Sequence, residues 1–396
     1  MLNVLVVGAG IGGLASAIAL ANGGHRVSVL ERAPQFSELG AGIQLAPNAF
    51  HALQQLGFAA EVHERAVYPD QLRLAAADND DIIIEIPLKG DYLQRFRHPY
   101  AVVHRADLYE ALLAKCHAHE TISLTPSTRV VAYKNEGDRV FALTADGERS
   151  QAGHLLVGAD GIRSSIRQQL VSDGPPQISG HTIYRSIIPI LAAPSWARSP
   201  SVTIWAGPGA HFVCYPVAGG NQLNMAAVID NNATTMTVGE PVEQQRVQRE
   251  FVRFSPAVRQ LIALGGQWRS WVLCDRPPID TWIDRRAALL GDAAHPMLQY
   301  AAQGACMALE DAVSLGAAMD SSGPRDVGVG LDRYVEDRQE RTAFAQYVSR
   351  QMGELIYHAS GPRARQRDSE LSAMTLAETL DRLSRMHEPV NVDAVR

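Results

Sequence analysis

The segment from Gly8 to Gly13 combines residue types and a spacing that suit the binding of a phosphate-containing cofactor. It reads GAGIGG and contains a GxGxxG pattern, with Gly8, Gly10 and Gly13 at the glycine positions and Gly12 beside the last of them. The first glycine of this pattern permits a tight turn, the second lets backbone N–H groups approach a pyrophosphate, and the third lets a helix pack on a strand. The segment predicts a dinucleotide site, with a bare glycine-rich turn as the alternative.

The residues on both sides of this turn predict the strand–helix–strand unit that such a site requires. Residues 2–7 are apolar and largely β-branched, as in a buried parallel strand, and 14–21 are small and apolar, as in a helix lying on a sheet. A second strand over 26–30 ends at Glu31, whose carboxylate can accept a hydrogen bond from a ribose hydroxyl. We also assign the adjacent Arg32 to this nucleotide site.

Two later segments again join a buried strand, a glycine beside an acid, and a helix. The first strand covers 154–159 and the second 287–290. The first leads into a helix N-terminus, which favours phosphate or ribose, with a routine β–α turn as the alternative for this segment alone. The second leads through a loop to a predicted helix over 306–319. The candidate cofactor residues in these segments are Asp160, Gly161, Asp292, Gly304 and Ala305.

Gly42 and Arg105 are weaker candidates for the same site. Gly42 lies in a glycine-rich stretch where the backbone could pass close to a flat ligand, and an ordinary loop is the alternative. Arg105 opens a predicted helix, from which it could reach a phosphate, but an arginine taken alone is more often a surface charge.

The composition is ordinary for a globular protein, with 46% hydrophobic and 20% charged residues over 396 positions. A net charge of −6 without a basic block argues against a nucleic-acid partner. The four cysteines show no CxxC spacing, so we expect free thiols, no metal site and a cytoplasmic protein. No run of about eighteen apolar residues is present, so we expect no membrane span.

The order and spacing of the three motifs resemble those of the single-component flavoprotein aromatic hydroxylases over about residues 2–350. The resemblance implies that the first fingerprint binds the ADP half of FAD, and that Asp160-Gly161 serves FAD and the pyridine nucleotide. It also implies that Asp292 lies near the ribityl phosphate and that Arg105 contacts FAD. The implied partners are tightly bound FAD, transient NADH or NADPH, O₂ and a small phenolic aromatic acid.

With this family in view, we expect an α/β fold. A Rossmann-like FAD-binding domain would comprise 1–172 and 268–325. Short strands separated by Gly and Pro over 173–267 predict a second, substrate-binding domain built on an antiparallel sheet. Residues 326–396 would form a helical C-terminal segment, which could mediate a homodimer.

In this family NADH reduces FAD, O₂ adds at flavin C4a, and the resulting hydroperoxide attacks an electron-rich ring. Loss of the phenolic proton activates the ring, so a base should face the hydroxyl. We expect His211 to accept or relay that proton and Gln299 to orient the hydroxyl. Tyr215 follows His211 by four residues on a predicted strand, so both lie on one face, and Tyr215 could bind the carboxylate. A structural role is the alternative for each.

Segments 210–216 and 295–300 resemble the 3-hydroxybenzoate 6-hydroxylases, which implies conversion of 3-hydroxybenzoate to 2,5-dihydroxybenzoate (gentisate). Salicylate hydroxylases generally carry a histidine where this chain has Ala302. The 6-hydroxynicotinate monooxygenases share 295–297 but usually diverge at 298–299. Both activities, and an FAD- or NAD-dependent dehydrogenase, stay open as alternatives, as does NADH against NADPH.

Overall fold

The computed structural model describes residues 1–37, 40–320 and 323–389. In that part of the chain the first sheet has the order β17 (Ile283–Asp284), β18 (Ala287–Leu289), β10 (Leu155–Gly158), β1 (Asn3–Val7), β2 (Arg26–Leu30), β7 (Ile122–Thr125). Its neighbours pair in parallel except β17 with β18. The central strand β1 buries Val4 to Val7, as its apolar, β-branched sequence predicts. The predicted strand–helix–strand unit is confirmed.

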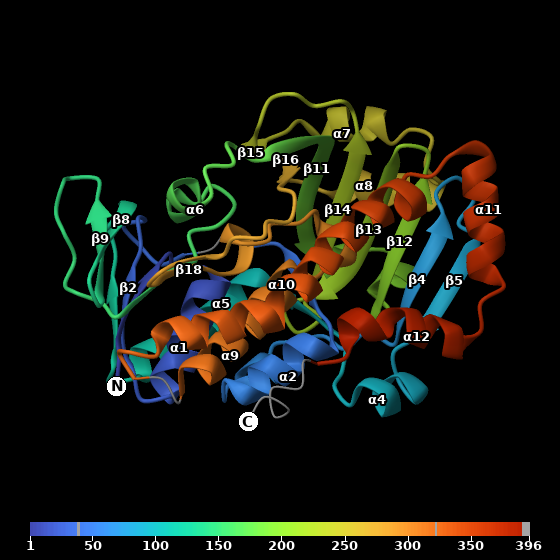
Figure 1. Ribbon diagram of the computed structural model, residues 1–396. Helices are drawn as coiled ribbons and strands as arrows, with labels where there is room; N and C mark the ends of the chain where they lie inside the picture. The colour runs from blue at the N-terminus through green and yellow to red at the C-terminus, as the bar shows by residue number, and fades with distance from the viewer. Residues whose placement is uncertain (38–39, 321–322, 390–396) are drawn as a thin grey trace.

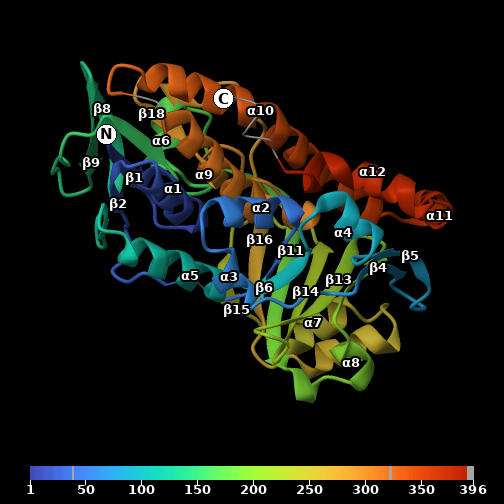
Figure 2. The same cartoon turned by 90° about the horizontal axis from the view of Figure 1, so that it is seen from below.

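Helices pack on this first sheet through small residues. α1 (Ile11–Asn22) lies against α9 (Gly304–Asp320), and both are rich in alanine. A Cβ on Gly316 would come within 2.9 Å of the Ala19 Cβ, so glycine permits this close approach. α5 (Arg105–Ala118) packs on α1 as well. Figure 2 shows α1, α9 and α5 near the first sheet, apart from the strands of the second sheet.

The second sheet lies beside the first, as the arrows at the right of Figure 1 show. Among the described residues its order is β15 (Val238–Pro241), β16 (Arg269–Asp275), β11 (Gln177–Pro189), β14 (Gln222–Asp230), β13 (Ala210–Val217), β12 (Ser201–Gly207), β4 (Gln71–Ala76), β5 (Ile82–Pro87). The pairs are antiparallel except β12 with β4. The predicted antiparallel sheet is confirmed, with this one parallel pair in it.

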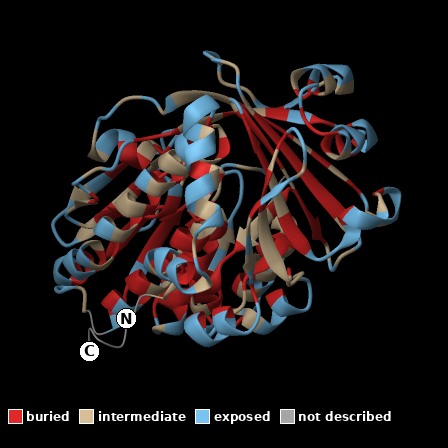
Figure 3. Cartoon of the chain, turned by 90° about the vertical axis from the view of Figure 1, so that its right-hand side faces the viewer, coloured by how far each residue is buried: buried red, intermediate tan, exposed pale blue. Residues whose placement is uncertain are grey.

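One face of the second sheet is closed by α7 (Gln244–Glu250) and α8 (Pro256–Leu264). Phe212 of β13 packs there in a buried cluster with Phe251 and Val258. Figure 3 shows these strands largely buried, in red. The residues that alternate with Phe212 along β13 point to the opposite face, which is the face available for a ligand.

The sheets do not divide at the predicted domain boundaries. β4 and β5 come from within 1–172 and β16 from within 268–325, yet all three belong to the second sheet. β4 joins it by pairing in parallel with β12, and β5 follows as the antiparallel partner of β4. Such non-local pairing leaves no mark on local sequence. The division into domains remains a prediction.

Shorter elements lie outside the two large sheets. Two small antiparallel pairs join β3 (Gly42–Leu45) to β6 (Ala101–His104) and β8 (Val130–Glu136) to β9 (Arg139–Thr144). The short helices are α2 (Pro47–Gln55), α3 (Ala59–His63), α4 (Asp91–Phe96) and α6 (Ser165–Leu170). Of these elements, β3 bears directly on the candidate site through Gly42.

The C-terminal segment is helical and is packed onto both sheets. α10 (Val327–Gln351) crosses the front of the molecule in Figure 1, and its Tyr334 hydroxyl donates to the Leu289 carbonyl of β18. A π-helical turn (Met352–Tyr357) leads to α11 (Gly361–Ser372) beside β5 and α12 (Leu376–His387) beside α4. Residues 38–39, 321–322 and 390–396 of the predicted segments lie outside the described residues. No described helix is both long and apolar enough to cross a bilayer.

Candidate active site

A cavity of about 370 Å³ lies where the carboxyl ends of β1, β10 and β18 meet the open face of the second sheet. Ligands of open α/β sheets bind at this edge, because helix N-termini and loops converge there. The predicted site residues that line it are Gly10, Gly12, Gly42, Arg105, Gly161, His211, Tyr215, Asp292, Gln299, Gly304 and Ala305. Among the described residues, Gly8, Gly13, Glu31, Arg32 and Asp160 are not part of this lining.

The glycine turn after β1 is shaped by close contacts. Gly8 has φ +99°, and a Cβ there would lie 2.5 Å from the Ala159 carbonyl oxygen. A Cβ on Gly13 would lie 2.0 Å from the Gly8 carbonyl oxygen, and one on Gly12 2.8 Å from Leu290 Cδ2. These three glycines let the turn, α1 and β18 pack closely.

Gly10 has a different role from its neighbours, since a Cβ there would meet nothing within 4 Å. It is the N-cap residue of α1, and no side chain caps this helix. The first N–H groups of the helix therefore remain available on the cavity side. A helix N-terminus of this kind binds phosphate, so the turn fits the pyrophosphate of a dinucleotide.

Glu31 holds the turn in place. One carboxylate oxygen accepts the Ala9 N–H at 2.8 Å and the other accepts the Ala33 N–H at 2.8 Å. Each oxygen keeps a lone pair for a ribose hydroxyl. The neighbouring Arg32 is exposed. The bracing of the turn by Glu31 is a second role that sequence reasoning did not assign to it.

Asp160 caps a helix, whereas its neighbour Gly161 reaches the cavity. The Oδ2 of Asp160 accepts the Ser165 N–H at 2.7 Å, at the start of α6, and its Oδ1 is buried with no partner among the described residues. Burial raises the pKa of the Asp160 carboxyl, although hydrogen bonds from Ser164 and from the α6 backbone oppose that rise.

The loop after β18 presents Asp292 to the cavity, close to the start of α9. A Cβ on Gly304 would lie 4.0 Å from the Asp292 Oδ1, and Gly291 has φ +62°. Surrounding protein raises the pKa of the Asp292 carboxyl, against the opposing effects of His295 and Arg105. Asp292 therefore faces the cavity, and it takes no part in the ion pairs that hold the loop to α9 and α10.

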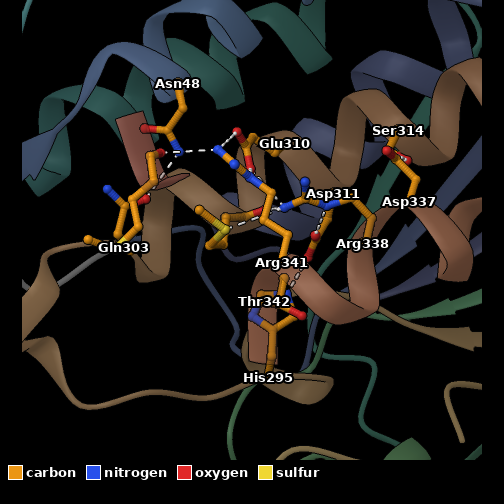
Figure 4. A network of polar contacts seen from close by, with 12 residues as sticks. Asn48, His295, Gln303, Glu310, Asp311, Ser314, Asp337, Arg338, Arg341 and Thr342 are labelled. Carbon is orange, nitrogen blue, oxygen red and sulfur yellow. Dashed lines mark hydrogen bonds and ion pairs between the residues drawn. The ribbon is translucent and has the colours of Figure 1, made fainter. Parts of the chain in front are cut away.

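A buried polar network holds this loop to the neighbouring helices, and Figure 4 shows its side chains His295, Asp311 and Arg338. Asp311 of α9 accepts the Gly291 N–H at 3.0 Å, contacts His295 Nε2 at 2.5 Å and accepts from Arg338 Nε at 2.8 Å. Burial works against the Asp311 charge, but His295 and Arg338 overcome it and lower the pKa of Asp311 to about 2. Glu310 provides a second carboxylate for Arg338 at 2.9 Å. The network ties the Asp292 loop to α9 and α10.

Gly42 permits a close approach of β3 to the second sheet. Its N–H donates to Asn224 Oδ1 at 2.9 Å, and a Cβ there would come within 2.5 Å of the Tyr215 ring. Arg105 follows β6, the strand that pairs with β3. Its backbone N–H donates to the Ala41 carbonyl, and its side chain lines the cavity.

The sheet side of the cavity follows strand alternation. His211 and Tyr215 of β13 both line it with Val213 between them, so the prediction that they share a face is confirmed. Burial raises the pKa of Tyr215 to about 12, although Arg185 and a hydrogen bond with Gln44 oppose the rise. Its hydroxyl is therefore uncharged at neutral pH.

His211 is paired with a second histidine that the sequence did not reveal. Its Nδ1 lies 2.9 Å from Nε2 of His358, which follows the π-helical turn. Burial, reinforced by His358 and His181, lowers the pKa of His211 well below its usual value. Burial and His181 also lower the pKa of His358 to about 3. Both rings are therefore neutral near pH 7.

Three further residues complete the cavity. Arg185 of β11 donates from Nη2 to Gln299 Oε1 at 2.6 Å, and Tyr300 and Tyr357 close the end beside His211. Arg185 is the only arginine or lysine on β11, a strand that the sequence predicted. A charged residue in that position could have been recognised from the sequence as a candidate site residue. Tyr357 lies in the predicted helical C-terminal segment, and nothing local in the sequence marks it as a cavity residue.

A glycine turn at a helix N-terminus, opening into a cavity walled by a second sheet, defines a dinucleotide-binding protein with an attached substrate site. Residues 1–351 match the family described as FAD binding domain. Two curated relatives match nearly the full length. The 3-hydroxybenzoate 6-hydroxylase 1 of Aquipseudomonas alcaligenes is 43% identical over 94% of each chain. The 3-hydroxybenzoate 6-hydroxylase of Polaromonas naphthalenivorans is 40% identical over 91% of this chain and 89% of the relative.

The chain therefore belongs to the FAD-dependent aromatic hydroxylases, and FAD is its cofactor. The open space at Gly10 and the uncapped start of α1 fit this cofactor. Among solved structures, HpxO of Klebsiella pneumoniae complexed with FAD and uric acid has a TM-score of 0.84, covers 98% of each chain and is 22% identical. At that identity the likeness concerns the fold alone.

Proposed function

We propose that the protein hydroxylates 3-hydroxybenzoate para to its hydroxyl and forms 2,5-dihydroxybenzoate. One O₂ supplies one oxygen atom to the ring and one to water, while NADH and a proton are consumed and NAD⁺ is released. The observation that carries the proposal is His211 on the cavity wall, with its second nitrogen bound to His358. The near full-length similarity to two relatives named 3-hydroxybenzoate 6-hydroxylase supports it.

FAD, once reduced, supplies the activated oxygen. We propose that the N–H groups after Gly10 bind its pyrophosphate and that Glu31 binds its ribose, with Arg32 beside it. Asp292 would hold the ribityl-phosphate region. The further residues proposed to contact FAD are Gly8, Gly12, Gly13, Gly42, Arg105, Asp160, Gly161, Gly304 and Ala305.

His211 would take the phenolic proton. Because its Nδ1 contacts His358, the nitrogen left for the substrate is Nε2. Loss of the proton raises electron density at the para carbon, where oxygen is added. Gln299 Oε1 is occupied by Arg185, so its NH₂ group is the part free to donate to the phenolic oxygen. The uncharged Tyr215 hydroxyl would donate to the carboxylate.

The test is NADH oxidation and O₂ uptake by the purified FAD-loaded protein, with products identified by chromatography. Salicylate, 6-hydroxynicotinate and NADPH are run in parallel. We expect 3-hydroxybenzoate to stimulate NADH oxidation and to yield 2,5-dihydroxybenzoate in proportion. A stronger response to either other acid, or peroxide as the only product, would reject the proposal.

We further propose a cytoplasmic homodimer. The four cysteines are all free thiols, which suits a reducing compartment. Light scattering coupled to size exclusion would measure the mass, and a monomer of 43.0 kDa would reject the dimer.

A further inference from the structure

Arg185 is a cation on the cavity wall that makes no ion pair with an acidic side chain among the described residues. It lies on β11, lines the cavity and is half-buried. Its Nη2 donates to the neutral amide of Gln299, and its guanidinium carbon lies 5.9 Å from the centroid of the Trp271 ring. The nearby Arg105 adds more positive charge. A half-buried guanidinium without an acidic partner favours the binding of an anion, because partial desolvation of an uncompensated charge is costly.

From this charge imbalance we infer that Arg185 binds the carboxylate of an aromatic acid and selects acids over neutral phenols. The inference deepens the proposed function and rests on it for the aromatic ring. Arg185 presents a planar fork of donors, which suits a carboxylate. Tyr215, being uncharged, can add a hydrogen bond there but cannot compensate the charge.

The register of the second sheet determines how far Arg185 lies from the strand of His211, the proposed base. Arg185 lies opposite Ala226 on β14, and Ala226 lies opposite Val213 on β13, so two strand spacings of about 4.8 Å each separate Arg185 from the His211 strand. A substrate held by its carboxylate at Arg185 can thus present a hydroxyl on another ring carbon toward His211.

The bond from Arg185 to Gln299 couples the two ends of the substrate. Because Nη2 occupies Gln299 Oε1, the amide NH₂ is directed to another acceptor, and the other guanidinium N–H groups stay free for the carboxylate. Arg185 thereby selects the acid and positions the residue that we propose to orient the phenol.

The test measures binding rather than turnover. Benzoate and benzamide, which lack the phenolic hydroxyl, are titrated into the FAD-loaded protein while flavin absorbance is followed. We expect benzoate to bind about 10- to 100-fold more tightly than benzamide, as a charge-assisted pair allows. In Arg185→Gln this preference should fall to about threefold or less, and Arg185→Lys should restore part of it. Arg269→Gln is the matched control, because Arg269 pairs with Arg185 in the β-ladder but is exposed.

Two outcomes would overturn the inference. One is an equal loss of benzoate and benzamide affinity in Arg185→Gln, reproduced by Gln299→Leu, which would leave Arg185 as a support for Gln299 alone. The other is an unchanged preference for benzoate. If the preference depends on Arg185 while 3-hydroxybenzoate gives no 2,5-dihydroxybenzoate, the proposed function fails and the carboxylate site stands. Should Arg185→Gln lose FAD, Arg185→Lys and Arg185→Met provide the same comparison.

Discussion

The imidazole rings of His211 and His358 lie 2.9 Å apart, nitrogen to nitrogen, although 147 positions separate them in the chain. Two neutral imidazoles can share this contact if one donates and the other accepts. If His211 Nδ1–H is the donor and His358 Nε2 the acceptor, the Nε2 of His211 is left as an acceptor. We propose that the second histidine sets the tautomer of the first in this way, as partners of functional histidines generally do.

His358→Phe should therefore slow hydroxylation of 3-hydroxybenzoate. Without the acceptor, His211 can place its proton on Nε2, and that form cannot take a proton from the phenol. We expect kcat/KM to fall by about 10- to 100-fold, the range of a general-base contribution. Stopped-flow and steady-state assays at pH 7 to 9 measure it.

The control for this substitution is benzoate binding. Benzoate has no phenolic proton, so its dissociation constant in His358→Phe should stay within about threefold of the parent value, and FAD content should be unchanged. An unaltered kcat/KM would mean that His358 does not set the protonation of His211.

Gly10→Ala should weaken FAD binding without unfolding the protein. The added methyl group meets nothing within 4 Å in the protein and projects into the space proposed for the pyrophosphate. We expect the FAD dissociation constant to rise at least about tenfold. Flavin fluorescence titration of the apoprotein measures this directly.

Gly266→Ala is the matched control for Gly10→Ala. A Cβ on Gly266 also meets nothing within 4 Å, but Gly266 lies outside the cavity. Both variants should keep the thermal midpoint of the parent apoprotein, and equal FAD affinity in the two would contradict the proposed position of the pyrophosphate.

The sequence was informative where structure depends on neighbouring residues. The turn at Gly8 to Gly13 and the shared face of His211 and Tyr215 follow from local spacing, and both were predictable. The pairing of β4 with β12 and the arrival of His358 beside His211 depend on contacts between distant segments, which one sequence does not display. Arg185 falls between these cases, because its strand was predicted but its charge was not interpreted.

Asp311→Asn should destabilise both the fold and the FAD site. The carboxylate holds Arg338 and His295 and accepts the Gly291 N–H beside Asp292. Removal of its charge leaves Arg338 buried with Glu310 alone, so we expect a loss of about 3 kcal/mol in the free energy of unfolding. Urea denaturation measures the loss.

Asp332→Asn on the exposed side of α10 serves as the comparison for Asp311→Asn and should change stability by less than about 0.5 kcal/mol. FAD affinity should fall in Asp311→Asn alone. Equal stability of the two variants would show that the network in Figure 4 does not support the Asp292 loop.

The buried histidine of α12 offers a test of stability against pH that is remote from the chemistry. Burial, followed by the charge of Arg341, lowers the pKa of His387 to about 3, and its Nδ1 lies 2.9 Å from the Tyr92 hydroxyl. When the pKa of a histidine is lower in the folded state than in the unfolded state, the protein keeps its full stability above the unfolded-state pKa, which is near 6.5. The protein loses stability as the pH falls below that pKa, because the unfolded state then binds the proton more readily. Between pH 8 and pH 5 the loss from this one group is about 2 kcal/mol.

His387→Gln keeps an acceptor for Tyr92 but cannot be protonated. From pH 8 to pH 5 the unfolding free energy of the variant should therefore fall by about 2 kcal/mol less than that of the parent. His117→Gln, at an exposed position on α5, should follow the parent at every pH. Urea denaturation at pH 8, 6.5 and 5 with saturating FAD compares the three proteins under equal ligand linkage. Parallel curves for the parent and His387→Gln would mean that His387 is protonated in the folded protein, since only a neutral buried ring makes the parent lose stability faster in acid.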